Sequence, residues 1–138
     1  MAFLLDTNVL SEVRKRERCN ASVRRWFSTV CDEDLYLSVL VIGEIRRGVE
    51  MLRRRDTRGA AALERWVHDL EHHYEDRILP ITLEVCRIWG GLSVNRPLAP
   101  IDGLLAATAL HHGLTMVTRN VEDVRRSGVD ILDPFARE

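Results

Sequence analysis

Residues 1–8, MAFLLDTN, place a short apolar run directly before a carboxylate and two polar side chains. The run over 2–5 is too short for a helix, so it predicts a buried strand that ends at Asp6. Thr7 and Asn8 then begin a helix-like segment. A carboxylate at the end of a parallel strand lies where open α/β sheets bind ligands. Because Asp is also a common helix cap, Asp6 is a candidate for either role.

Composition limits the classes of protein to which the chain can belong. Its 138 residues, 46% of them hydrophobic, predict one globular domain over 1–138. No apolar run has the length of a membrane span, and the first residues do not match a signal peptide, so we expect a cytoplasmic protein without a membrane anchor. The three cysteines are widely spaced and odd in number, which predicts free thiols. The net charge of −1 is not that of a uniformly basic nucleic-acid-binding protein.

Short apolar segments alternate along the chain with segments of helical spacing. The strand candidates are 2–5, 35–38, 78–81, 115–118 and 129–132. Pro80 cannot donate a backbone hydrogen bond, which predicts that 78–81 is either an edge strand or an irregular one. Strands that alternate with helices form parallel sheets. The sequence therefore predicts an α/β fold with a central parallel sheet of about five strands and helices on both faces.

The helix candidates share a cap residue, a helical apolar stripe or both. They are 8–17, a short segment capped by Asn20, a segment capped by Ser38, an amphipathic helix ending near Tyr74, a segment opened by Thr82, a buried helix over 101–112 stopped by Gly113, and 121–127. The Thr82 segment is expected to turn Val85, Ile88, Trp89 and Leu92 inward. A charged break at 53–59 includes three consecutive arginines, which we expect to form a solvated loop.

Three carboxylates stand out by position in these elements. Asp6 ends the first strand, Glu44 lies in a largely apolar helix, and Asp102 opens a buried helix. Singly, each has an ordinary explanation as a cap, a surface residue or a partner of the helix dipole. Together they can meet at the carboxyl edge of the sheet, where they cannot all stay ionised without a cation. Oxygen ligands of this kind favour Mg²⁺, which also binds waters and substrate phosphate.

A polar triplet follows the fourth strand at the same edge. Thr118 is expected to support the acidic residues, Arg119 to face phosphate, and Asn120 to hold a metal-bound water or a phosphate oxygen. Arg47 lies one turn after Glu44 on nearly the same helix face, so it is a second candidate for binding phosphate. The alternative is that Arg47 forms a surface ion pair with Glu44 or Glu50.

These motifs resemble the PIN-domain ribonucleases, and most of all the VapC-type toxins of bacterial toxin–antitoxin pairs. The resemblance rests on LLDTNVLSE, a Glu within VIGEIRRGVE, PIDGLLAATALHHGLTMVTRNVEDV and a closing DILDPF, and it covers 4–135. It implies a PIN-like fold, and a metal-dependent endoribonuclease that leaves a 5′-phosphate and a 3′-hydroxyl. It also implies a homodimer and a small antitoxin that covers or neutralises the acidic pocket.

The resemblance places metal-binding and catalytic roles on Asp6, Glu44 and Asp102, with Mg²⁺ or Mn²⁺ as the ion. Thr7 falls on the small hydroxyl residue that supports the carboxylates. The family's fourth acidic position is Asn120 in this chain, so either Asn120 or Asp123 is expected to fill that role.

Other classes of protein fit less well. The chain has no glycine-rich phosphate loop after any strand, which argues against nucleotide-binding oxidoreductases and ATPases. A receiver domain needs a lysine late in the fold, and Lys15 is the only lysine. A phosphatase with an aspartate nucleophile needs a second Asp where Asn8 stands. The alternative that stays open is a catalytically weak PIN-like module that binds RNA or a partner, because a fold does not determine a function.

Overall fold

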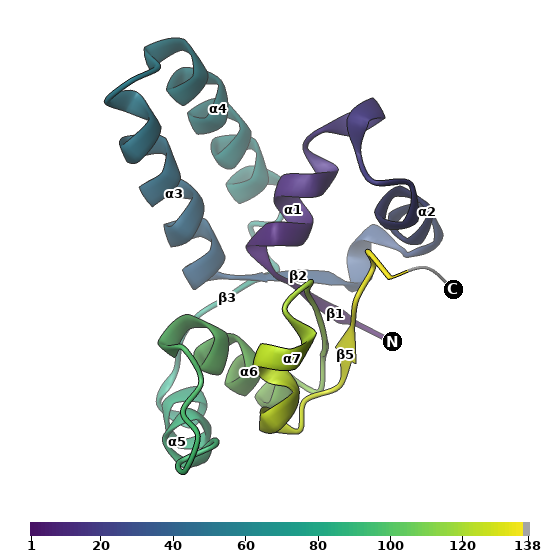
Figure 1. The fold of residues 1–138 in the computed structure, drawn as a ribbon, viewed down its shortest axis with the longest axis vertical. Coiled ribbons are helices and arrows are strands. Elements are labelled where there is room, and N and C mark those ends of the chain that lie inside the picture. The colour runs from purple at the N-terminus through teal and green to yellow at the C-terminus, as the bar shows by residue number, and fades with distance from the viewer. Residues whose placement is uncertain (137–138) are drawn as a thin grey trace.

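A five-stranded parallel sheet forms the centre of the computed structural model, which describes residues 1–136 (Figure 1). Its strand order is β3-β2-β1-β4-β5. The strands are β1 (Phe3–Leu5), β2 (Leu35–Ser38), β3 (Ile78–Leu79), β4 (Thr115–Val117) and β5 (Ile131–Leu132). Every strand pair is parallel, and β3 is at an edge, as Pro80 predicted.

Helices cover both faces of this sheet, as the alternation of elements predicted. The helices are α1 (Thr7–Val13), α2 (Ala21–Thr29), α3 (Val39–Arg53), α4 (Thr57–His73), α5 (Leu83–Gly91), α6 (Pro100–His112) and α7 (Val121–Val124). Figure 1 shows α1 to α4 on one side of the sheet and α5 to α7 on the other. None of the helices in 1–136 combines the length and hydrophobicity needed to cross a bilayer.

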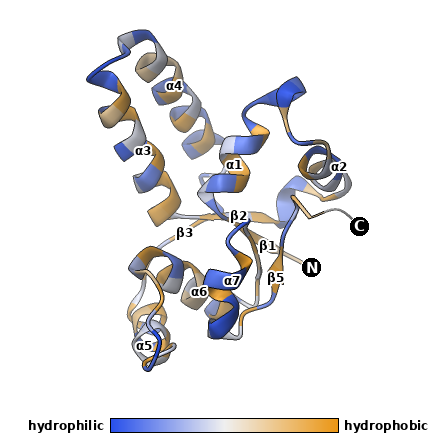
Figure 2. Cartoon of the chain, in the orientation of Figure 1, coloured by the Kyte–Doolittle hydropathy of each residue, from blue (hydrophilic) through white to orange (hydrophobic). Residues whose placement is uncertain are grey.

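The central strand β1 is apolar on both faces because helices cover both. Leu4 and Leu5 are almost fully buried, and Figure 2 shows the strands mainly in the colours of apolar residues. β1 pairs with β2 on one side and β4 on the other, with Leu5 in register with Val117. The carboxyl ends of β1 and β4 therefore lie next to each other, which brings the residues after them together.

The cap residues define most helix ends as the sequence predicted. The side chain of Asn20 accepts from two backbone N–H groups of α2, and Ser38 and Thr82 each accept from one in α3 and α5. Gly113 ends α6 with φ of 65°, a left-handed conformation that glycine adopts without strain.

Three helix predictions are wrong in detail. The helix expected over 8–17 ends at Val13, because Arg16 has φ of 55°, outside the right-handed helical region. Only a 3-10 turn follows it, over Arg16–Arg18. The break expected at 53–59 is shorter, because α3 runs to Arg53 and the Asp56 side chain caps α4 by accepting from Gly59 N. The helix over 121–127 ends at Val124 and continues as a 3-10 turn to Ser127.

The inward orientation expected for Trp89 is also wrong. Trp89 is 41% exposed, whereas Val85 in the same helix is fully buried. A Cβ atom at Gly103 would lie 2.9 Å from the Trp89 ring, so the ring occupies the space that this glycine leaves open beside α6. Trp89 therefore packs at the margin between α5 and α6 rather than in the core.

An ion-pair cluster joins the end of α4 to the segments that lead into β2 and β3. His73, the last residue of α4, has its Nε2 2.9 Å from Asp32 Oδ1, and Arg77 Nη2 donates to Asp32 Oδ2 at 3.0 Å. Arg77 Nη1 also donates to the carbonyl oxygen of Leu35, in β2. Burial alone would raise the pKa of Asp32, but the hydrogen bonds and charges of His73 and Arg77 outweigh burial and lower it.

We predict that Asp32→Asn lowers the free energy of unfolding at pH 7 by about 0.2–1 kcal/mol, the range of partly exposed ion pairs. A lowered native pKa means that the stabilisation is complete above the unfolded value of 3.8 and is lost as pH falls through the native pKa. Urea denaturation at pH 7 and at pH 3 measures the loss of unfolding free energy and its dependence on pH. Asp130→Asn, an exposed carboxylate at the amino end of β5, is the control; equal losses in both variants would contradict the prediction.

Candidate active site

Asp6 lies between β1 and α1 and is buried, with 6% of its surface exposed. Its Oδ1 accepts from Thr7 N at 2.7 Å, and its Oδ2 accepts from Thr118 Oγ1 at 2.7 Å. The Asn8 Nδ2 group lies 3.4 Å from the same Oδ2. Asp6 is therefore the cap of α1, and its second oxygen is held by the residue after β4.

Thr7 connects the start of α1 to α3. Its Oγ1 donates a hydrogen bond to Glu44 Oε1 at 2.7 Å, and both residues are half-buried. Since Thr7 follows Asp6 directly, this bond joins the Glu44 side chain to the segment that carries Asp6. The structure thus brings together two of the acidic residues selected from the sequence.

Asp102 lies in the first turn of α6, behind Pro100. Burial raises the pKa of Asp102, and the negative charges of Asp6, Asp123 and Glu44 raise it further. The four carboxylates therefore share one electrostatic environment at the carboxyl edge of the sheet. Within 1–136, no arginine, lysine or histidine forms an ion pair with any of them.

The donor chemistry of this pocket fits a hard divalent cation. Carboxylates with no basic partner need a positive counter-charge, and Mg²⁺ typically takes one or two carboxylates and keeps several waters. Among residues 1–136, no group of three or more Asp, Glu, His or Cys residues is arranged so that it could hold a metal ion by itself. A cation in this pocket would therefore have to be held partly by water.

Of the triplet Thr118, Arg119 and Asn120 after β4, only Thr118 has a side chain bonded to an acidic residue of the pocket. Thr118 is fully buried, donates to Asp6 and accepts from Asn120 N at 3.0 Å. Asn120 is exposed and its side chain does not cap α7. Asp123 is exposed as well, and its charge acts on Asp102. Thr118 therefore links the triplet to Asp6 through its hydroxyl.

Arg119 packs on the C-terminal segment. Its guanidinium carbon lies 4.1 Å from the centre of the Phe135 ring, which is close enough for a cation–π contact. Its backbone N donates to Asn8 Oδ1 at 3.3 Å. Arg119 is nevertheless exposed, so part of its side chain faces solvent.

Asn8 and Phe135 are site residues that the sequence reading did not select. Asn8 contacts Asp6 and Thr118 through Nδ2 and Arg119 through Oδ1. The sequence feature that could have identified Asn8 is its place inside DTN, directly after the acidic and hydroxyl residues. Phe135 stands in the closing DILDPF motif, and nothing local connects that motif with position 119.

Arg47 is exposed and forms no ion pair within 1–136. The alternative pairing with Glu44 or Glu50 is therefore not present: Glu50 pairs with Arg53, and Glu44 accepts from Thr7.

A five-stranded parallel sheet with acidic side chains gathered at its carboxyl edge defines the general class: an α/β protein with an acidic pocket. The PIN domain family matches residues 3–126, and the chain belongs to this family.

Relatives cover nearly all of the chain. Toxin FitB of Neisseria gonorrhoeae is 32% identical over 138 residues, with 96% of this chain and 98% of the toxin covered. VapC ribonuclease Y4jK of Sinorhizobium fredii is 31% identical over 138 residues, with 96% and 97% covered. The crystal structure of FitAcB from Neisseria gonorrhoeae superposes with a TM-score of 0.86 at 32% identity, covering 96% of this chain and 98% of that chain. The PIN-like fold expected from the sequence is thereby confirmed.

We predict that Asp102→Asn raises the melting temperature of the metal-free protein at pH 7, because it removes one of four mutually repelling carboxylates. A raised native pKa means that the cost of ionising Asp102 is complete above the native pKa, so the gain should shrink as pH falls through the native pKa towards the unfolded value of 3.8 and vanish below it. Thermal melts in EDTA at several pH values, with Asp130→Asn as control, measure this effect. A variant less stable than the wild type at pH 7 would show that Asp102 is not repelled by its neighbours.

Proposed function

We propose that the protein is a metal-dependent endoribonuclease and acts as the toxin of a toxin–antitoxin pair, with residues 1–138 forming one nuclease domain in the cytoplasm. The observation that carries the proposal is the set of carboxylates without basic partners at the sheet edge of a PIN-family chain. The relatives named VapC ribonuclease and Toxin FitB support the ribonuclease and toxin assignments.

Asp6, Glu44 and Asp102 would hold Mg²⁺ or Mn²⁺. When bound, such an ion supplies an activated water and neutralises the charge that develops on a phosphodiester during hydrolysis. The chain's own residues fix the ligands: Thr7 orients Glu44 through its hydroxyl, and Thr118 orients Asp6. Supporting hydrogen bonds of this kind set the direction and basicity of metal ligands.

The fourth acidic role is divided between two residues. Asp123 carries the negative charge that acts on Asp102, whereas Asn120 offers a neutral amide that can bind a water or a phosphate oxygen. We therefore propose Asp123 as the electrostatic member of the site and Asn120 as a polar contact to substrate.

RNA needs basic side chains near an acidic pocket, because phosphate contacts dominate the affinity of nucleic-acid binding. Arg119 is exposed in the loop after β4, directly after Thr118, and Arg47 is exposed on α3, three residues after Glu44. We propose that both contact the RNA backbone. Arg119 would do so from its place on the Phe135 ring, which limits the positions its guanidinium can take.

A small antitoxin and a second copy of the chain are the proposed protein partners. A groove of about 850 Å³ lies between α1, α2 and α4, and its lining combines Phe27, Trp66 and Leu70 with several arginines. A lining of apolar side chains in which basic residues outnumber acidic ones is suited to an amphipathic, partly acidic segment of an antitoxin. A basic antitoxin side chain that reaches the acidic pocket would neutralise it.

The alternative is a PIN-like module that binds RNA or a partner without efficient cleavage. The intact set of Asp6, Glu44 and Asp102 favours the nuclease, because a binding module has no need for mutually repelling carboxylates. Cleavage assays separate the two functions.

We predict that Asp6→Asn reduces Mg²⁺-dependent cleavage of RNA by more than the roughly 10–100-fold that loss of a supporting residue costs, because a direct ligand is removed. Purified wild type and variant are incubated with total RNA in Mg²⁺ or EDTA, and the RNA ends are mapped. Asp130→Asn is the control and should cleave like the wild type. Cleavage by Asp6→Asn at the wild-type rate would exclude the proposed site, and absence of metal-dependent cleavage by the wild type would favour the binding module.

We also predict that Mg²⁺ or Mn²⁺ raises the melting temperature of the wild type, because the ion binds only the folded site. The stabilisation is about 2.7 kcal/mol when the ion is at 100 times its Kd. Asp102→Asn should respond much less than the wild type. Differential scanning calorimetry at increasing metal concentration makes the measurement, and identical responses of wild type and variant would place the ion elsewhere.

A further inference from the structure

Two adjacent arginine pairs stand seven residues apart: Arg46 with Arg47 in α3, and Arg53, the last residue of α3, with Arg54, which Arg55 follows. In each pair the first arginine forms ion pairs with glutamates. Arg46 forms ion pairs with Glu71 and Glu64 of α4. Arg53 forms ion pairs with Glu64 at 3.0 Å and with Glu50 at 3.1 Å.

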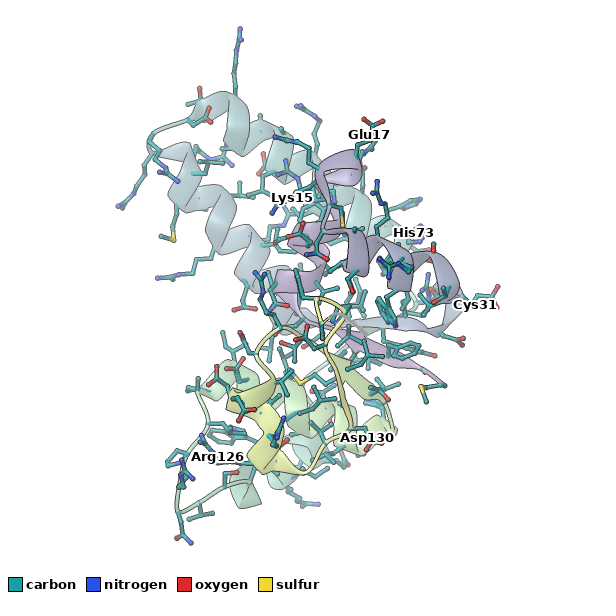
Figure 3. All side chains as sticks on the ribbon, turned by 45° about the vertical axis from the view of Figure 1, so that its right-hand side comes forward. Lys15, Glu17, Cys31, His73, Arg126 and Asp130 are labelled. Carbon is teal, nitrogen blue, oxygen red and sulfur yellow. The ribbon has the colours of Figure 1, made fainter. Side chains whose placement is uncertain are left out.

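The second arginine of each pair is different. Arg47 and Arg54 are exposed, and neither forms an ion pair with any residue of 1–136. The expectation of one solvated arginine loop is thus only partly right, because Arg53 belongs to the helix–helix contact, while Arg54 and Arg55 are exposed and form no ion pair within 1–136. Figure 2 shows the turn between α3 and α4 as strongly hydrophilic, and Figure 3 shows nitrogen-tipped side chains projecting outward from this hairpin.

The free arginines form a row that starts beside the acidic pocket. Seven residues of helix are nearly two full turns, so positions 47 and 54 lie on the same face about 10 Å apart. Glu44, whose carboxylate is bonded to Thr7, is less than one turn before Arg47. The row therefore leads from the pocket along α3 to the end of the α3–α4 hairpin, which projects from the sheet in Figure 1.

An arginine row of this kind has the chemistry of a polyanion site. Arg47 and Arg54 have no carboxylate paired with them, because α4 supplies acids only to the other arginine of each pair. Guanidinium groups bind phosphate oxygens bidentately, and a nucleic-acid strand offers a phosphate at every nucleotide. A strand with one phosphodiester in the acidic pocket can continue past both side chains.

We propose that Arg47 and Arg54 form a phosphate-binding row that holds the RNA strand on one side of the cleaved bond. This inference rests on the proposed ribonuclease function and extends its substrate site by two turns of α3. It assigns separate roles to neighbouring arginines: Arg46 and Arg53 join α3 to α4, and Arg47 and Arg54 bind RNA.

The test uses the full chain and a fluorescent single-stranded RNA, with binding measured in EDTA at several salt concentrations. Arg47→Ala and Arg54→Ala should each flatten the slope of log affinity against log salt by about 0.7, the value for one phosphate contact to a single strand. The double variant should lose about twice as much. Arg46→Ala and Arg53→Ala remove the same charge one residue away and should keep the wild-type slope, and thermal melts of all variants verify folding.

Equal loss of slope in the row variants and the control variants would overturn the proposal, because net charge alone would then explain binding. Wild-type slopes in both row variants would also overturn it, because the row would then not bind RNA. A row that binds an acidic protein instead of RNA would give this result. These outcomes are independent of the cleavage assay. A wild type that binds RNA through the row but does not cleave it would reject the nuclease and keep the row.

Discussion

Mutual repulsion among carboxylates is the constraint on which the rest of this structure depends. Asp6, Glu44 and Asp102 come from three distant parts of the chain, and the fold brings them to one edge of the sheet without a basic partner. Such an arrangement costs stability in the absence of a cation. The surrounding structure must therefore hold these side chains in place, and the buried strands and helix caps supply that rigidity.

Hydrogen bonds between distant segments hold the acidic residues. Thr118 joins the end of β4 to Asp6, and Thr7 joins α1 to Glu44. In each case a hydroxyl donates to a carboxylate, which keeps its negative charge while its direction is fixed. Lysine or arginine in these places would neutralise the pocket, whereas a hydroxyl leaves its charge available for an ion.

The order of elements and the edge position of β3 could be predicted from the sequence, because they depend on local signals. Ser38 and Asn20 are strong caps, and Pro80 excludes a central strand position. Arg16 could not be predicted, since its left-handed conformation has no local signature in a non-glycine residue. The candidate acidic residues could be selected from their positions at strand and helix ends. The hydrogen bonds that hold these acidic residues, and the stacking of Arg119 on Phe135, join residues far apart in the sequence. They could be found only from the three-dimensional structure.

The contact between Trp89 and Gly103 has a consequence for which sequences this fold can accept. Gly103 follows Asp102 in α6, and the indole ring fills the volume where any larger residue would place its Cβ atom. Positions 89 and 103 are therefore not free to vary independently: any larger residue at 103 requires the Trp89 ring to shift or a smaller residue at 89. An exposed side chain thus restricts the choice of residue beside the acidic pocket.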